Sequence, residues 1–228
     1  MKLNTNSNTY ILAYASLLVI AVAFVLAYFS QALKPIQDKN VALDKKKQII
    51  AALNIRDVND NQVEEYYNKL VEADEIINEK NEVLSAGKPG GENDGFKLNG
   101  GDFKAGKLAL FVCNVDGQKK YVMPVYGMGL WGGISGYIAI NADKETIYGV
   151  YFNHEGETAG LGAEIKDNQK WQQQFCGKHL FADGNQDAVA LSVCKKVDNP
   201  ATQVDGVSGA TLTCDGVTRM IHEGLGKY

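Results

Sequence analysis

A short segment near the end of the chain combines the features of an anion site. Residues 205–213 read DGVSGATLT, and a helical pattern begins at about Thr211. The first backbone N–H groups of a helix have no partner within it, and the helix dipole favours an anion there by about 0.3–1 kcal/mol at an exposed position. Gly209 and Ala210 leave room for a bulky phosphoryl group to approach the Thr211 hydroxyl. An ordinary helix start, with Ser208 or Thr211 as the N-cap, is the plain alternative.

A second segment could present apolar side chains from a permissive backbone. Residues 127–132 read GMGLWG, which matches the G-x-G-x-x-G pattern. A dinucleotide fingerprint needs a helix that opens at the third glycine, whereas a strand pattern follows here, so we reject that interpretation. Leu130 and Trp131 could instead pack against a planar ring. A tight turn with a core tryptophan explains the segment equally well.

A third segment is richer in polar residues and glycine than a simple connection requires. Residues 153–165 read NHEGETAGLGAEI, between a predicted strand and a predicted helix. The other two histidines lie far away in the sequence and no H-E-x-x-H spacing is present, so we predict no metal site. Thr158, Leu161 and Gly162 could line a ligand pocket. The three site segments are therefore residues 127–132, 153–165 and 205–213.

Strands and helices at regular spacing should position these segments. The expected elements are strands at 108–115 and 120–125 joined by Asp116 and Gly117, strands at 137–140 and 146–152 joined by residues 141–144, a helix at 163–175, a strand at 188–193 and a helix from about 211 to 224. Asp-Gly between two apolar runs is a strong hairpin signal. Hairpins followed by helices predict an α+β fold with an antiparallel sheet and packed helices, not a doubly wound parallel one.

A long apolar run lies near the start of the chain. Residues 10–29 read YILAYASLLVIAVAFVLAYF, with no charge, proline or glycine. Such a helix extends about 30 Å, the thickness of the hydrocarbon core of a bilayer. A buried soluble helix and a cleaved signal peptide are the alternatives, but the apolar region of a signal peptide is usually only about 7–15 residues long. We therefore expect one transmembrane helix that anchors the chain in the lipid bilayer.

A helical connecting segment and a loop are predicted next. Residues 38–54 form a short helix around Ile49 and Ile50, and residues 61–81 form an amphipathic helix with Val63, Tyr66, Tyr67 and Leu70 on its apolar face. The opposite face is expected to be solvated and carries Glu64, Glu65, Glu72 and Asp74. Residues 85–107 are dense in glycine, lysine and asparagine, which predicts a flexible surface loop or linker. The expected domains are an anchor at 10–29, the connecting segment at 30–84, the loop at 85–107 and a folded domain at 108–228.

Composition and cysteine spacing argue against two classes of function. The formal net charge of −4 argues against a nucleic-acid partner, which normally requires a basic surface. The four cysteines lie far apart and form no C-x-x-C pair, which is unlike a zinc or iron–sulfur site. We expect them to be small buried apolar residues, and one disulfide bridge remains open.

The segment from Asp205 to Thr211 resembles the D-x-x-[ST]-G-A-T sequence at which a flavin transferase attaches FMN to threonine through a phosphoester. Together with the other two site segments and the anchor, the chain resembles the C subunit of bacterial Na⁺-translocating NADH:quinone oxidoreductases, an FMN-binding domain family shared with the G subunit of the Rnf complex. The resemblance covers most of the chain. It implies a covalent FMN on Thr211 in a site formed by Ser208, Gly209, Ala210, Leu212 and Thr213, with Leu130 and Trp131 against the isoalloxazine and with Glu157, Thr158, Leu161 and Gly162 on its other edge.

The resemblance also implies a role, partners and a location. The chain would be an electron relay without a catalytic residue or substrate site of its own, in a Na⁺-pumping membrane complex. Its partners would be the flavin-bearing B subunit, the integral-membrane subunits and the maturing flavin transferase. Small residues of the anchor could pack against neighbouring helices; these are Ala13, Ala15, Ser16, Ala21 and Ala23.

The lysines and the family disagree about orientation. Only Lys2 and the terminal amine precede the span, whereas Lys34 and Lys39 follow it, which by the positive-inside rule places the domain in the cytoplasm. The family places it on the periplasmic face of the bacterial inner membrane. We follow the family, because long domains translocate largely regardless of charge. The alternatives are an FMN subunit of an Rnf-type or other membrane reductase complex, and a non-catalytic anchored assembly module.

Overall fold

The computed structural model describes residues 7–182 and 187–228. Lys2, which entered the orientation argument, lies outside the described residues. The chain divides into two compact units, Met1–Asp44 and Lys45–Tyr228. The first unit holds most of a single long helix, and the second holds the sheet and all three site segments.

Helix α1 runs without interruption over Asn8–Ala52. The predicted anchor and the predicted helix at 38–54 are therefore parts of one helix, although Pro35 lies inside it. Proline removes one backbone hydrogen bond, but the helix-favouring residues around it carry the helix across this defect. By length and composition α1 can cross a membrane, and its most apolar stretch is not buried in the protein. Ile49 and Ile50, near its end, are buried.

The described residues of the second unit form a six-stranded sheet in the order β2-β1-β3-β4-β5-β6, in which every neighbouring pair is antiparallel. The predicted hairpins are present as β3 (Lys107–Val115) with β4 (Gln118–Met128) and β5 (Gly133–Asn141) with β6 (Ile147–His154). Asp116 and Gly117 have φ of 50° and 79°, as a type I′ turn requires. The α+β fold with an antiparallel sheet is thus confirmed.

The prediction of one helix over 61–81 is correct for its first half and wrong for its second. Helix α2 covers only Val63–Leu70, and Val71–Asn78 form strand β1, which pairs with β3 along its length. Pairing with an apolar strand overrides the local helical pattern here. Glu72 stays exposed, but Asp74 is fully buried, contrary to the prediction of a solvated acidic face.

Asp74 organises the segment predicted as a flexible loop. Its carboxylate accepts the backbone N–H groups of Lys88, Asp94 and Phe96 at 3.3, 3.1 and 3.3 Å. The region contains strand β2 (Val83–Ser85), the 3₁₀ helix η1 (Gly95–Lys97) and helix α3 (Gly100–Lys104). Phe96 is buried, so this segment packs into the same unit as the sheet.

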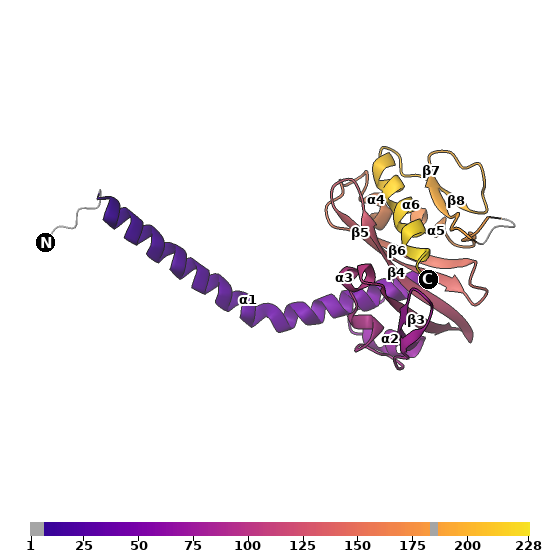
Figure 1. The fold of residues 1–228 in the computed structure, drawn as a ribbon, viewed down its shortest axis with the longest axis horizontal. Helices are drawn as coiled ribbons and strands as arrows, with labels where there is room; N and C mark the ends of the chain where they lie inside the picture. The colour runs from indigo at the N-terminus through magenta and orange to yellow at the C-terminus, as the bar shows by residue number, and fades with distance from the viewer. Residues whose placement is uncertain (1–6, 183–186) are drawn as a thin grey trace. The chain divides into compact units, whose positions relative to one another are not determined.

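Helices and the end of α1 cover the sheet. On one face, side chains such as Ile138 and Phe152 form the main core with helix α6 (Thr211–Leu225). Figure 1 shows α6 beside β4, with which it makes its most extensive contact. On the other face, the last turn of α1 lies against β6, since a Cβ added to Gly149 would meet the Ala52 carbonyl oxygen at 2.5 Å.

The elements after β6 differ in detail from the prediction. The helix expected at 163–175 is two short helices, α4 (Glu164–Asp167) and α5 (Gln169–Gln173), because Asn168 adopts an extended backbone and caps α5 through Trp171 N–H. The strand expected at 188–193 is β7 (Ser192–Cys194), paired in parallel with β8 (Gln203–Asp205), which was not predicted. Helix α6 begins at Thr211 as predicted.

Helix α6 approaches the end of β4 closely at two glycines. A Cβ added to Gly216 would lie 2.4 Å from the Met128 carbonyl oxygen, and one added to Gly127 would lie 2.7 Å from Met220 Cβ. Only glycine permits this backbone approach. The contact fixes the first half of α6 beside the turn that follows β4.

Candidate functional site

One buried carboxylate joins the three site segments. Glu157, 8% exposed, accepts the backbone N–H of Trp131 at 2.9 Å and the Thr213 hydroxyl at 2.7 Å. Its own backbone N–H donates to His154 Nδ1 at 3.2 Å. Segments that are 26 and 56 residues apart from Glu157 in the sequence therefore meet at this side chain.

Glycines surround the Glu157 carboxylate. A Cβ added to Gly129 would lie 2.4 Å from Glu157 Oε1, and one added to Gly162 would lie 2.3 Å from Oε2 and 2.7 Å from Thr213 Oγ1. Neither position has room for a larger residue unless the carboxylate moves. The glycines of the second and third segments thus serve close packing around Glu157 as well as chain reversal.

Hydrogen bonds keep Glu157 ionised. Burial acts to raise the pKa of its carboxyl group, whereas the Thr213 hydroxyl, the backbone N–H groups of Trp131 and Leu130, and nearby His154 lower it. The second group of effects is stronger, so the pKa of Glu157 lies below its ordinary value of 4.5. A negative charge is therefore present inside the site at neutral pH.

The start of α6 presents Thr211 to solvent. The N-cap is Ala210, and no side chain caps the helix, so the alternative of an ordinary helix start capped by Ser208 or Thr211 is wrong. Ser208, Thr211 and Leu212 are exposed, whereas Ala210 and Thr213 are buried. Because no side chain occupies the uncapped backbone N–H groups beside the Thr211 hydroxyl, this helix start can accept an anion.

Exposed apolar side chains gather on the site segments. Among the described residues of Lys45–Tyr228, five of the eight exposed large apolar residues belong to these segments, namely Met128, Leu130, Trp131, Leu161 and Leu212. Trp131 is 69% exposed, which excludes the interpretation as a core tryptophan. The Gly129 N–H donates to the Gly132 carbonyl at 2.9 Å and closes a tight turn that projects Leu130 and Trp131 outward.

Leu161 packs against the segment that leads into α6. Gly209 has a φ of +76°, which favours glycine, and a Cβ added there would lie 2.7 Å from Leu161 Cδ2. Thr158, in the same loop as Leu161, is exposed. The segments 153–165 and 205–213 therefore contact each other directly, in addition to their link through Glu157.

Helix α5 supplies supporting residues that the sequence analysis missed. Trp171 Nε1–H donates to the Asp205 carbonyl at 2.7 Å, and Gln174 Oε1 accepts the Asp205 N–H at 3.2 Å. An open groove of about 450 Å³ lies between α5 and Ser208. The sequence placed a helix here, but nothing in its pattern indicated which side chains would reach the 205–213 segment.

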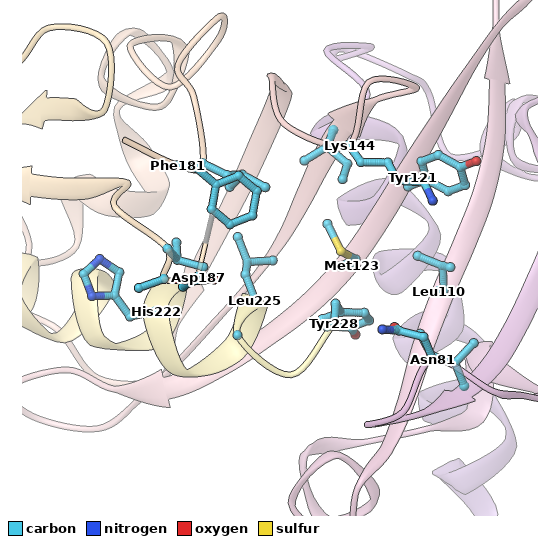
Figure 2. Close-up of a pocket in the computed structure, with 16 residues that line it drawn as sticks. Asn81, Leu110, Tyr121, Met123, Lys144, Phe181, Asp187, His222, Leu225 and Tyr228 are labelled. Atoms are coloured by element: carbon cyan, nitrogen blue, oxygen red, sulfur yellow. The ribbon is translucent and has the colours of Figure 1, made fainter. Parts of the chain in front are cut away.

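A larger cavity of about 630 Å³ lies away from these segments. Figure 2 shows Met123 and Tyr121 of β4, Leu225 at the end of α6 and Phe181 around it. None of the predicted site residues lines this cavity, which borders the end of α6 opposite Thr211.

The cysteines are free thiols in the part of the chain that the structure describes. Cys113 and Cys214 are buried as predicted, Cys194 is half-buried and Cys176 is exposed. The expectation that all four are buried apolar residues is therefore wrong for Cys176.

Known proteins resemble this chain in sequence and in fold. Residues 129–226 match the family model described as FMN-binding domain. The C subunit of the Na(+)-translocating NADH-quinone reductase of Haemophilus ducreyi is 32% identical over 95% of this chain and 89% of its own length. The crystal structure of the protein of that name from Parabacteroides distasonis has a TM-score of 0.77 and 36% identity, and covers 86% of this chain and 94% of its own. The crystal structure of Shewanella oneidensis NqrC has a TM-score of 0.64 and 27% identity, and the match covers 80% of this chain and 91% of that one.

Proposed function

The chain belongs to the family formed by the C subunits of the Na⁺-translocating NADH-quinone reductases, and we propose that it carries FMN covalently on Thr211 and relays electrons within such a complex. The observation that carries this proposal is the exposed hydroxyl of Thr211 at an uncapped helix start, inside the FMN-binding domain match. The match to the FMN-binding domain makes FMN the expected cofactor.

The residues fit the phosphate of FMN. The uncapped N–H groups at the start of α6 favour a phosphate on Thr211, and Gly209 with buried Ala210 leaves its approach open. Ser208 and Leu212 are exposed on either side of this position. These N–H groups would therefore stabilise a phosphoester at Thr211, because no capping side chain has to be displaced from them first.

The residues also fit a planar ring. Leu130 and Trp131 project from their turn, and Leu161 and Leu212 add exposed apolar surface from the other two site segments. Aromatic and aliphatic side chains of this kind line ring-binding sites. Thr158 is exposed and can contact the ring, whereas Glu157 and Gly162 are buried and act from beneath these residues.

Bound FMN supplies one-electron and two-electron redox chemistry, and the protein supplies position and electrostatics. We propose no separate substrate site on this chain. We further propose that residues 10–29 of α1 span the bacterial inner membrane, with the flavin domain on the periplasmic side. Its partners would be the flavin-bearing B subunit, the integral-membrane subunits and a flavin transferase.

The attachment can be tested with two matched variants. The full chain and its Thr211→Ala and Thr146→Ala variants are co-expressed with a flavin transferase and compared on denaturing gels under ultraviolet light; Thr146 lies outside the three site segments and serves as the control. We expect fluorescence from the wild type and from Thr146→Ala, and none from Thr211→Ala. Mass spectrometry should place one FMN on the peptide that contains Thr211. Fluorescence that survives in Thr211→Ala, or an unlabelled wild type, would refute the proposal.

A further inference from the structure

In the part of the chain that the structure describes, Glu157 forms no salt bridge, although His154 lies near enough to favour its charge. The ion pairs found among residues 7–182 and 187–228 join other side chains. Glu157 is held instead by the Trp131 N–H and the Thr213 hydroxyl, within the proposed flavin site. A buried carboxylate costs free energy unless it is hydrogen-bonded, and Glu157, unlike the structural Asp74, places its charge among the residues of the proposed flavin site.

The bond to Thr213 fixes the rotation of α6. Successive helical residues are rotated by about 100°, so Thr213 and Thr211 point about 200° apart around the helix axis. The hydrogen bond at 2.7 Å holds Thr213 inward, and Thr211 accordingly faces solvent. The same carboxylate holds the turn of Trp131 at 2.9 Å. The Glu157 side chain thus fixes the position of Thr211 relative to the turn that carries Leu130 and Trp131.

We propose that Glu157 is a positioning residue for the flavin, and that its negative charge makes the bound FMN harder to reduce. This inference rests on the proposed function. Reduction adds negative charge to FMN, and a nearby fixed anion opposes that addition more strongly in a partly buried site than in water. The carboxylate would thereby hold the midpoint potential of the flavin below the value that a neutral residue would give.

Two substitutions separate position from charge. In Glu157→Gln the amide oxygen can still accept the Trp131 N–H, and the amide NH₂ can donate to Thr213 Oγ1, so the contacts persist without the charge. Thr213→Val keeps the charge and removes one contact, and Thr213→Ser restores the hydroxyl. Glu155→Gln removes an exposed charge from the same loop, and its amide oxygen can still accept the Gly133 N–H that Glu155 accepts at 3.3 Å, so it serves as the control for net charge.

The first test uses the flavin-loaded full chain in detergent. FMN content is measured by mass before any potential, so that loss of attachment is not mistaken for a redox effect. We expect Glu157→Gln to shift the midpoint potential positively, by more than Glu155→Gln does. We expect Thr213→Val, and not Thr213→Ser, to change the circular dichroism of the bound flavin. An unchanged potential in Glu157→Gln, or matching spectra for Val and Ser, would overturn the inference.

The second test does not depend on the flavin. In the unloaded full chain, hydrogen exchange of the Trp131 N–H should accelerate about tenfold or more in Glu157→Ala, because its charged acceptor is lost. The same amide should exchange at the wild-type rate in Glu155→Gln, which keeps an acceptor for the Gly133 N–H. Equal exchange rates in Glu157→Ala and wild type would refute positioning by Glu157. The attachment proposal is decided separately, by the gel fluorescence of wild type and Thr211→Ala.

Discussion

Gly162→Ala should destabilise the folded domain through a collision with the Glu157 carboxylate. The added Cβ would lie 2.3 Å from Glu157 Oε2 and 2.7 Å from Thr213 Oγ1, well inside normal contact distance. The carboxylate must move away and break its hydrogen bond to Thr213, or the loop must shift. Overpacking of this kind costs about 1–3 kcal/mol, and a lost hydrogen bond to a charged group costs a similar amount. These are two routes to relieve one collision, so their costs are not summed.

Thermal unfolding measures the effect. A change of 1 kcal/mol shifts Tm by about 2–4 °C in a domain of this size, so Gly162→Ala should lower the Tm of the unloaded full chain by about 2–12 °C. Gly156→Ala is the matched control, because the nearest atom to its added Cβ is the Trp131 carbonyl oxygen at 4.0 Å. Its Tm should stay within about 2 °C of wild type. Equal Tm values for Gly162→Ala and wild type would refute the reasoning, as would an equal loss in Gly156→Ala.

Three further outcomes are expected. Trp131→Ala should leave the free energy of unfolding within about 0.5 kcal/mol of wild type, since the side chain is 69% exposed, and should raise the native fluorescence of bound flavin; an unchanged fluorescence would argue against ring contact. Asp74→Ala should lower the free energy of unfolding in urea by at least about 3 kcal/mol and speed proteolysis within residues 85–98, because three backbone N–H groups lose their acceptor. The pKa of Glu157 is lower in the folded protein, so its contribution to stability is complete above pH 4.5 and is lost as the pH falls further. Urea unfolding against pH should therefore show a smaller acid loss for Glu157→Gln, and identical profiles would contradict the assignment.

Local signals predicted the elements that depend on local chemistry. The Asp116-Gly117 turn, both central hairpins and the start of α6 follow from turn residues and short-range periodicity. Strand β1 could not be found this way, because its residues continue the helical pattern of α2 and become a strand only through pairing with β3. The same holds for β8, which is short and has its partner in β7.

Burial of acids was the least predictable part of the site. Asp74 and Glu157 lie among other acidic residues in the sequence, and only the folded chain shows that each accepts several hydrogen bonds in the interior. The three site segments were identified from their composition, since they combine glycine with hydroxyl, acidic or aromatic residues. Their meeting point at Glu157 depends on contacts across 26 and 56 residues, which no single-sequence pattern encodes.

The glycine contacts between α6 and β4 have a consequence for electron transfer rates. With Gly216 against the Met128 carbonyl and Gly127 against Met220, the helix start and the neighbouring turn have little freedom to move apart. Dipoles that are already oriented need no rearrangement when charge appears beside them. For a flavin on Thr211, as proposed, the protein's own contribution to the reorganisation energy of electron transfer would then be small.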